Sequence, residues 1–179
     1  IVFIDYETTG LMFDEFNESA GNGEPLQIGA VRMRGNKVID RINIYMDPAM
    51  RMSEWEPWSR DNLVDMDGKP YTDAFFDNKP SIAEAHKLLA DFTGDSIVGM
   101  QNAVFDNEVL EKALKESGIE WRPAGILDTK EIADFTLPKW TAENPDGPTV
   151  TSKDGTKKPS SSLKAITEYL EVELGEKHH

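Results

Sequence analysis

The sequence has no cysteine and no long apolar run, and it has far fewer basic than acidic residues. Without cysteine, the 179-residue chain can form neither disulfide bonds nor thiolate metal sites. Any metal must therefore use oxygen or imidazole ligands, and the absence of cysteine fits a cytoplasmic location. No apolar stretch approaches the roughly 20 residues that cross a bilayer, and no segment has the pattern of a signal peptide. We therefore expect no membrane partner.

The formal net charge is −14, because 33 acidic residues stand against 19 Lys and Arg. Proteins that track a long polyanion present basic surfaces, so this charge argues against binding along an extended duplex. It does not argue against an enzyme whose bound cations neutralise one or two phosphates. One segment departs from the acidic trend, and we expect any contact with a nucleic acid backbone there. Its lysines are Lys139, Lys153, Lys157, Lys158 and Lys164.

Alternating strand and helix patterns predict a single α/β domain over residues 1–179. The turn-forming pair Gly35-Asn36 separates two strand patterns and predicts a hairpin, which makes the sheet at least partly antiparallel. We therefore expect a mixed sheet with helices on both faces. The predicted strands cover residues 1–4, 25–33, 37–46, 96–100 and 126–127.

The helical patterns lie mainly in the second half of the chain. Ser81 and Glu84 have the capping-box spacing and predict a helix start. Residues 138–161 are rich in Pro, Gly, Ser, Thr and Lys, which predicts a flexible surface loop. Short helices can sit within the irregular segment 47–80. The other predicted helices cover residues 106–117, 129–135 and 162–170.

Asp5 and Glu7 are the first candidates for a catalytic or metal-binding role, because they lie two apart where an apolar strand ends. Residues at this spacing point to the same face of a strand, so their carboxylates can converge. Two converging carboxylates repel each other unless a cation joins them, and Mg²⁺ and Mn²⁺ prefer such oxygen ligands. Taken alone, the spacing also fits a pair of solvated acids at a strand end.

Two longer blocks resolve this alternative. Asp5-x-Glu7-Thr8-Thr9-Gly10, after an apolar strand, resembles the first exonuclease motif of the DnaQ-like family. Residues 98–106 are similar to its second motif, which reads strand, Asn-x-x-Phe-Asp, helix. Residues 26–31 and 126–129 also match recurrent family segments. The resemblance therefore covers nearly the whole chain.

The resemblance implies a ribonuclease H-like fold with a mixed five-stranded sheet and a 3′→5′ exonuclease of the DEDDh group. Such an enzyme releases nucleoside monophosphates from the 3′ end of a single strand, here expected to be DNA. Asp5, Glu7 and Asp106 would hold two Mg²⁺ or Mn²⁺ ions, and His179 would be the general base. By the same analogy, the substrate-binding residues would be Thr8, Thr9, Gly10, Leu11, Asn102 and Phe105.

The third family motif is where the sequence departs. In the DEDDh group the histidine is followed, five residues on, by the last metal-binding aspartate, but the printed chain stops at His178-His179. The fourth carboxylate is therefore expected beyond the printed residues. The His-His pair resembles polymerase-associated relatives in which the second histidine acts, which favours His179. Tag remnants or surface histidines are the alternative, and Tyr169 with Glu173 has the spacing of a tyrosine variant of the family.

Several alternatives stay open at this stage. The substrate can be RNA or short oligoribonucleotides instead of DNA, and a DNA polymerase can be a partner. The chain can also be a retired exonuclease fold that only tethers a polymerase. We expect His86 to be a surface or packing residue rather than a ligand, and Asp128 to form a structural hydrogen bond rather than to bind metal.

Overall fold

The structure, a computed structural model, describes residues 1–10, 23–65 and 67–172. The elements in chain order are β1 (Val2–Thr8), β2 (Pro25–Arg34), β3 (Lys37–Tyr45), the 3-10 helix η1 (Met52–Glu54), α1 (Pro57–Asn62), α2 (Asp73–Phe76), α3 (Ile82–Thr93), β4 (Ile97–Met100), α4 (Ala103–Ser117), β5 (Gly125–Asp128), α5 (Thr129–Thr136), β6 (Thr149–Thr151), β7 (Lys157–Pro159) and α6 (Leu163–Tyr169).

A five-stranded sheet with the order β3-β2-β1-β4-β5 forms the centre of the molecule. Strand β1 pairs antiparallel with β2 on one side and parallel with β4 on the other. The predicted hairpin of β2 and β3 is antiparallel, and β5 continues the parallel part. The expected α/β fold with a mixed five-stranded sheet is therefore confirmed.

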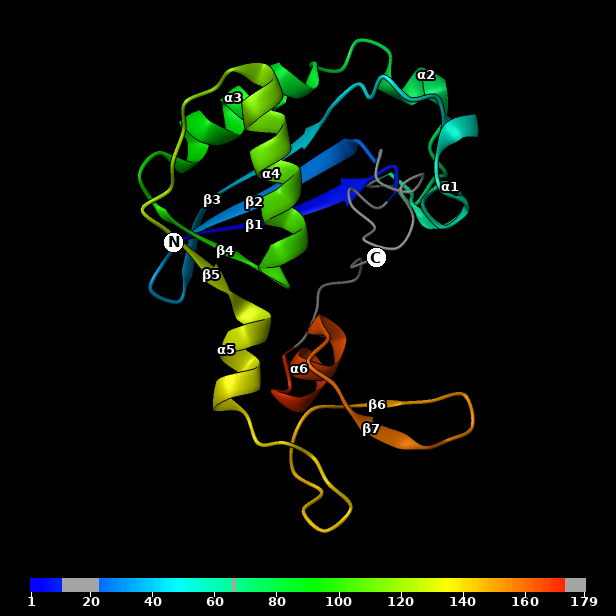
Figure 1. The fold of residues 1–179 in the computed structure, drawn as a ribbon, viewed down its shortest axis with the longest axis vertical. Coiled ribbons are helices and arrows are strands. Elements are labelled where there is room, and N and C mark those ends of the chain that lie inside the picture. The colour runs from blue at the N-terminus through cyan, green and yellow to red at the C-terminus, as the bar shows by residue number, and fades with distance from the viewer. Residues whose placement is uncertain (11–22, 66, 173–179) are drawn as a thin grey trace.

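Helices α3 and α4 contact each other, and both contact strands of this sheet. Figure 1 shows them together above the strands, with α5 and α6 further along the molecule beyond β5. The main core lies where the apolar residues of these helices meet the sheet. Its buried members include Val2, Ile4, Tyr6, Ile28, Ala30, Val98, Met100, Leu89, Val109 and Leu110.

The alternation along β1 decides which of its residues belong to this core. Ile4 and Tyr6 are buried, whereas Asp5 is exposed and Glu7 is half-buried. Successive strand residues point to opposite faces, so the apolar residues face the core and the acids face away from it. The strand extends to Thr8, so both acids lie within it and not after its end.

Helix α3 begins as its sequence predicted. The Ser81 hydroxyl accepts a hydrogen bond from the Glu84 N–H, and a Glu84 carboxylate oxygen accepts one from the Ser81 N–H at 2.8 Å. These reciprocal bonds satisfy two N–H groups that the first helical turn leaves without partners.

The segment between β3 and α3 holds the expected short helices around a second, aromatic cluster. Trp55 and Tyr71 contact each other edge to face, with ring centroids 6.3 Å apart, and Phe76 also packs against both. All three are buried. The irregular segment is thus held by ring packing instead of regular backbone pairing.

Residues 138–161 are not a loop throughout. Strands β6 and β7 form a two-stranded antiparallel sheet in which Val150 pairs with Lys158. A turn through Gly155, with φ of +83°, joins them. Glycine, threonine and lysine in this segment therefore build a hairpin, shown at the lower right of Figure 1. The composition that predicted a loop describes the turn and the links but misses the pairing.

No helix in the described ranges is long and apolar enough to cross a membrane.

Candidate active site

Asp5 and Glu7 lie on the face of the central strand that points away from the main core. Burial raises the pKa of Glu7 to about 7, and the negative charge of Asp5 adds to this rise. The charge of Asp5 therefore affects the ionisation of Glu7, and the convergence of the two carboxyl groups on one cation stays a prediction. A carboxyl group with this pKa stays mostly protonated below pH 7, and a nearby positive charge favours its ionised form.

Asp106 comes to the same region from helix α4, where it lies in the first turns and is 3% exposed. Burial is the main cause that raises its pKa to about 7, and the charge of Asp5 is the next. The Glu7 charge acts in the same direction, while a hydrogen bond from the Tyr6 backbone opposes it. Residues about 100 positions apart thus form one electrostatically coupled acidic group.

Asp128, at the end of β5, holds the start of α4 in place. Its carboxylate accepts hydrogen bonds from the N–H groups of Asn102 at 3.1 Å and Ala103 at 2.8 Å. It also caps α5 by accepting from Lys130 and Glu131. Burial works to raise the pKa of Asp128, but these backbone bonds together outweigh it and lower the pKa. The expected structural role of Asp128 is confirmed.

The bonds to Asp128 also explain where α4 begins. The sequence predicted a start at Asp106, but the helix starts at Ala103. Asn102 takes a left-handed conformation with φ of +58°, and its own side chain makes no capping bond. The cap comes from a carboxylate 26 residues further along the chain, which no local pattern indicates.

Tyr6 and His86 form a buried hydrogen-bonded pair on the core side of β1. The Tyr6 hydroxyl lies 3.1 Å from His86 Nε2, and His86 Nδ1 lies 2.7 Å from the Ile82 carbonyl. A carbonyl only accepts, so Nδ1 carries the proton and Nε2 accepts from Tyr6. Burial lowers the pKa of His86, which keeps the ring neutral. His86 is a packing residue, as expected, but its link to the site through Tyr6 was not anticipated.

The motif residues that follow β1 are tightly held. Thr8 donates to the Gly10 carbonyl at 2.7 Å, and the Thr9 hydroxyl accepts from the Glu24 N–H at 2.8 Å. A Cβ on Gly10 would lie 2.5 Å from Glu56 Cγ, so the space that glycine leaves is filled by the Glu56 side chain. The structure thus gives these residues packing roles, and their substrate contacts stay predictions.

The other predicted substrate residues differ in exposure. Asn102 is exposed at the start of α4, and Phe105 is half-buried and packs against the main core. Both lie within four residues of Asp106, as the motif requires. Leu11, Glu173, His178 and His179 lie outside the described residues, so their roles stay predictions. The Tyr169 hydroxyl donates to Asp146 at 2.9 Å.

The chemistry of this donor set fits a hard divalent cation, because the charge of Asp5 raises the pKa of both Glu7 and Asp106 and no basic group is among the causes of these two shifts. Within residues 1–10, 23–65 and 67–172, however, no three acidic or histidine side chains stand close enough to surround a metal by themselves. The ligand set of Asp5, Glu7 and Asp106 therefore stays a prediction.

Comparison with known proteins decides the family. A family model described as "Exonuclease" (RNase_T) matches residues 2–179. The chain belongs to this DnaQ-like exonuclease family. Its relatives include the PolC-type DNA polymerase III of Bacillus cereus, which is 28% identical over 138 residues, and that of Bacillus subtilis, which is 26% identical over 140. These matches cover 77% and 78% of this exonuclease-family chain but only 8% and 9% of the polymerases.

Solved structures agree on the fold of this exonuclease-family member. Exonuclease X in complex with 5′ overhanging duplex DNA superposes with a TM-score of 0.61 at 17% identity, covering 97% of this chain and 75% of that one. Apo Exonuclease I superposes with a TM-score of 0.63 at 17% identity, covering 96% of this chain and 37% of that one. The ribonuclease H-like fold that the motifs implied is therefore confirmed.

Proposed function

We propose that this chain is a metal-dependent 3′→5′ exonuclease of the DEDDh type that releases nucleoside monophosphates from single-stranded DNA. The observation that carries the proposal is the coupled acidic group of Asp5, Glu7 and Asp106, which stands at the motif positions of an exonuclease family. Acids that repel one another at a partly buried site cost stability unless they serve a charge that the protein binds.

The three carboxylates of Asp5, Glu7 and Asp106 would hold two Mg²⁺ or Mn²⁺ ions. When bound, such ions polarise the phosphoryl oxygen and stabilise the leaving 3′ oxygen. Burial and the charge of Asp5 raise the pKa of Glu7 and Asp106 to about 7. A cation that binds at neutral pH can therefore displace the protons of both groups into the solvent.

The remaining roles belong to residues that position these groups or the substrate. The backbone bond from Tyr6 and the cap from Asp128 hold Asp106 at the start of α4. His179 is the proposed base, because a neutral imidazole takes a proton from water near physiological pH. The substrate residues proposed by analogy are Thr8, Thr9, Gly10, Leu11, Asn102 and Phe105.

Two comparisons support DNA as the substrate and a polymerase as the partner. Exonuclease X, which shares the fold, is bound to duplex DNA with a 5′ overhang, and the curated relatives are DNA polymerases. The matched region spans 8% of the Bacillus cereus polymerase, so a proofreading role beside a polymerase is the proposed setting.

A cleavage assay with end-labelled substrates tests the proposal. Single-stranded DNA labelled at its 5′ end should shorten progressively with Mg²⁺ or Mn²⁺, and EDTA should stop the reaction. Asp5→Asn should lower the rate by about a thousandfold or more, as expected when a metal-centred stabilisation of the transition state is lost. Lys87→Ala, a change on the exposed face of α3, serves as the control and should cleave normally.

Four outcomes would contradict parts of the proposal. Cleavage that survives EDTA would remove the metal, and shortening of a 3′-labelled strand from its 5′ end would remove the polarity. Faster cleavage of a matched RNA strand would move the substrate from DNA to RNA. Binding of DNA without any cleavage would favour a retired module over an enzyme.

A further inference from the structure

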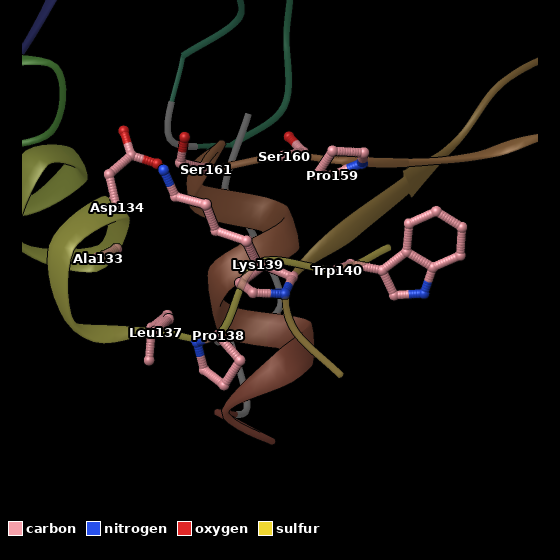
Figure 2. Close-up of a pocket in the computed structure, with 10 residues that line it drawn as sticks. Ala133, Asp134, Leu137, Pro138, Lys139, Trp140, Pro159, Ser160 and Ser161 are labelled. Atoms are coloured by element: carbon pink, nitrogen blue, oxygen red, sulfur yellow. The ribbon is translucent and has the colours of Figure 1, made fainter. Parts of the chain in front are cut away.

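A pocket of about 280 Å³ lies between α5 and the segment that carries the β6–β7 hairpin. We call it the hairpin pocket, and Figure 2 shows its residues. Those used below are Asp134, Pro138, Lys139, Trp140, Pro159 and Ser161. This volume lies just below the range of ligand pockets, which is about 300 to 1,000 Å³, so it suits a single planar group such as a nucleobase.

One side-chain contact joins the hairpin pocket to the segment that precedes α4. The Gln101 side chain donates from Nε2 to the Ser161 carbonyl at 3.1 Å. Its Oε1 accepts from the Thr129 hydroxyl at 2.6 Å. Gln101 directly precedes Asn102, where α4 begins, so one side chain ties the wall of the pocket to the edge of the acidic group.

The backbone around Trp140 is closely packed. Gly147 has φ of +125°, and a Cβ there would lie 2.2 Å from the Pro138 carbonyl oxygen and 2.7 Å from the Trp140 nitrogen. Only glycine allows this approach. The packing holds the backbone of Trp140 while its indole stays half-exposed at the side of the pocket (Figure 2). A held, half-exposed indole is suited to stacking on a base.

The charges around the hairpin pocket favour an anion. In the hairpin register, Lys157 pairs with Thr151 and Pro159 with Thr149, so Lys157 lies on the same face as the pocket residue Pro159. Lys158 lies on the opposite face. Both lysines are exposed, and neither forms an ion pair within the described residues.

The pocket also contains its own acid and a lysine. Asp134 lies 3.9 Å from Lys130, which offsets its charge. Lys139 is exposed and extends along the pocket, as Figure 2 shows. Lys130, Lys139 and Lys157 thus outnumber Asp134 among the charged residues named around the pocket, on a chain whose net charge is −14. A positive groove beside an aromatic ring is the usual arrangement for single-stranded nucleic acid.

We propose that the hairpin pocket holds the substrate strand upstream of its 3′ end, with one base stacked on Trp140 and phosphates beside Lys139 and Lys157. This inference rests on the proposed exonuclease function. An acidic peptide would use the two lysines but would leave the indole without a flat partner. The proposed metal site would contact the nucleic acid at its 3′ end only. The pocket would give this acidic protein a second contact with the same strand.

Binding of a labelled oligodeoxythymidine of about 12 nucleotides, within the range of single-strand site sizes, tests the proposal. Fluorescence anisotropy is measured on the full chain in EDTA, which separates binding from cleavage. Trp140→Ala should weaken binding roughly tenfold, the size that loss of one stacked base produces. Lys157→Ala should weaken binding and make the salt dependence shallower by about 0.7, the value for one phosphate on a single strand.

Lys158→Ala is the matched control, because it removes the same charge from the other face of the same strand. It should keep the wild-type affinity and salt dependence. Equal effects of the two lysine changes would overturn the proposal, as would wild-type affinity in Trp140→Ala with an unchanged circular dichroism spectrum. Displacement of the oligonucleotide by polyglutamate at equal concentration would assign the pocket to an acidic peptide. A chain that binds through the pocket but cleaves nothing would overturn the exonuclease function alone.

Discussion

Replacing Asp106 with Asn should stabilise the metal-free protein at alkaline pH while abolishing nuclease activity. Asp106 is 3% exposed, and its pKa is raised from 3.8 to about 7, first by burial and then by the charge of Asp5. The folded state therefore binds a proton more tightly than the unfolded state does. Stability falls as the pH rises from roughly 4 to roughly 7, and the full cost is present above that range.

The size of the effect follows from this difference of about three pH units. Each unit corresponds to about 1.36 kcal/mol, which sets an upper bound of about 4 kcal/mol. Asp5 and Glu7 repel the charge of Asp106, and their own ionisation changes when that charge is removed. We therefore expect Asp106→Asn to raise the free energy of unfolding by only about 2 kcal/mol at pH 8. Asn keeps an oxygen that can accept the Tyr6 backbone bond.

Urea unfolding in EDTA at pH 5 and pH 8 measures this prediction. The gain of Asp106→Asn should be clearly larger at pH 8 than at pH 5. Asp128→Asn is the matched control, because backbone bonds lower its pKa and the substitution should destabilise the protein at both pH values. If Asp106→Asn destabilised the protein at pH 8, or changed it equally at both pH values, the argument from the raised pKa would be wrong.

Three further predictions follow from the same contacts. Adding Mg²⁺ at pH 6 should release protons and raise the melting temperature of the protein. Asp106→Asn should reduce both effects. Calorimetry in two buffers measures the proton release. Tyr6→Phe leaves the buried His86 Nε2 without its donor and should cost about 1–3 kcal/mol in urea unfolding, whereas an unchanged midpoint would contradict the pair. Ser81→Ala removes the cap of α3 and should cost about 1 kcal/mol, and a loss no greater than that of the exposed Ser53→Ala would show that the cap contributes nothing.

The local parts of this protein could be predicted from its sequence. Asp5 and Glu7 share a face because a strand repeats every two residues, and α3 starts at Ser81 because a capping box needs only four neighbouring residues. The family also followed from short motifs, since each motif is a contiguous block. The hairpin at 149–159 was missed because its composition is that of a loop and its pairing depends on contacts with α6.

Long-range placement belongs to the tertiary structure. The sequence marked Asp106 as a site residue, but its burial and its coupling to Asp5 arise only when α4 packs beside β1. The start of α4 depends on the Asp128 carboxylate, and the link between Gln101 and Ser161 spans 60 residues. Periodicity and capping rules act over a few residues, so they determine elements and their faces. Which of those faces meet, and which carboxylates share one field, is decided by how the elements pack.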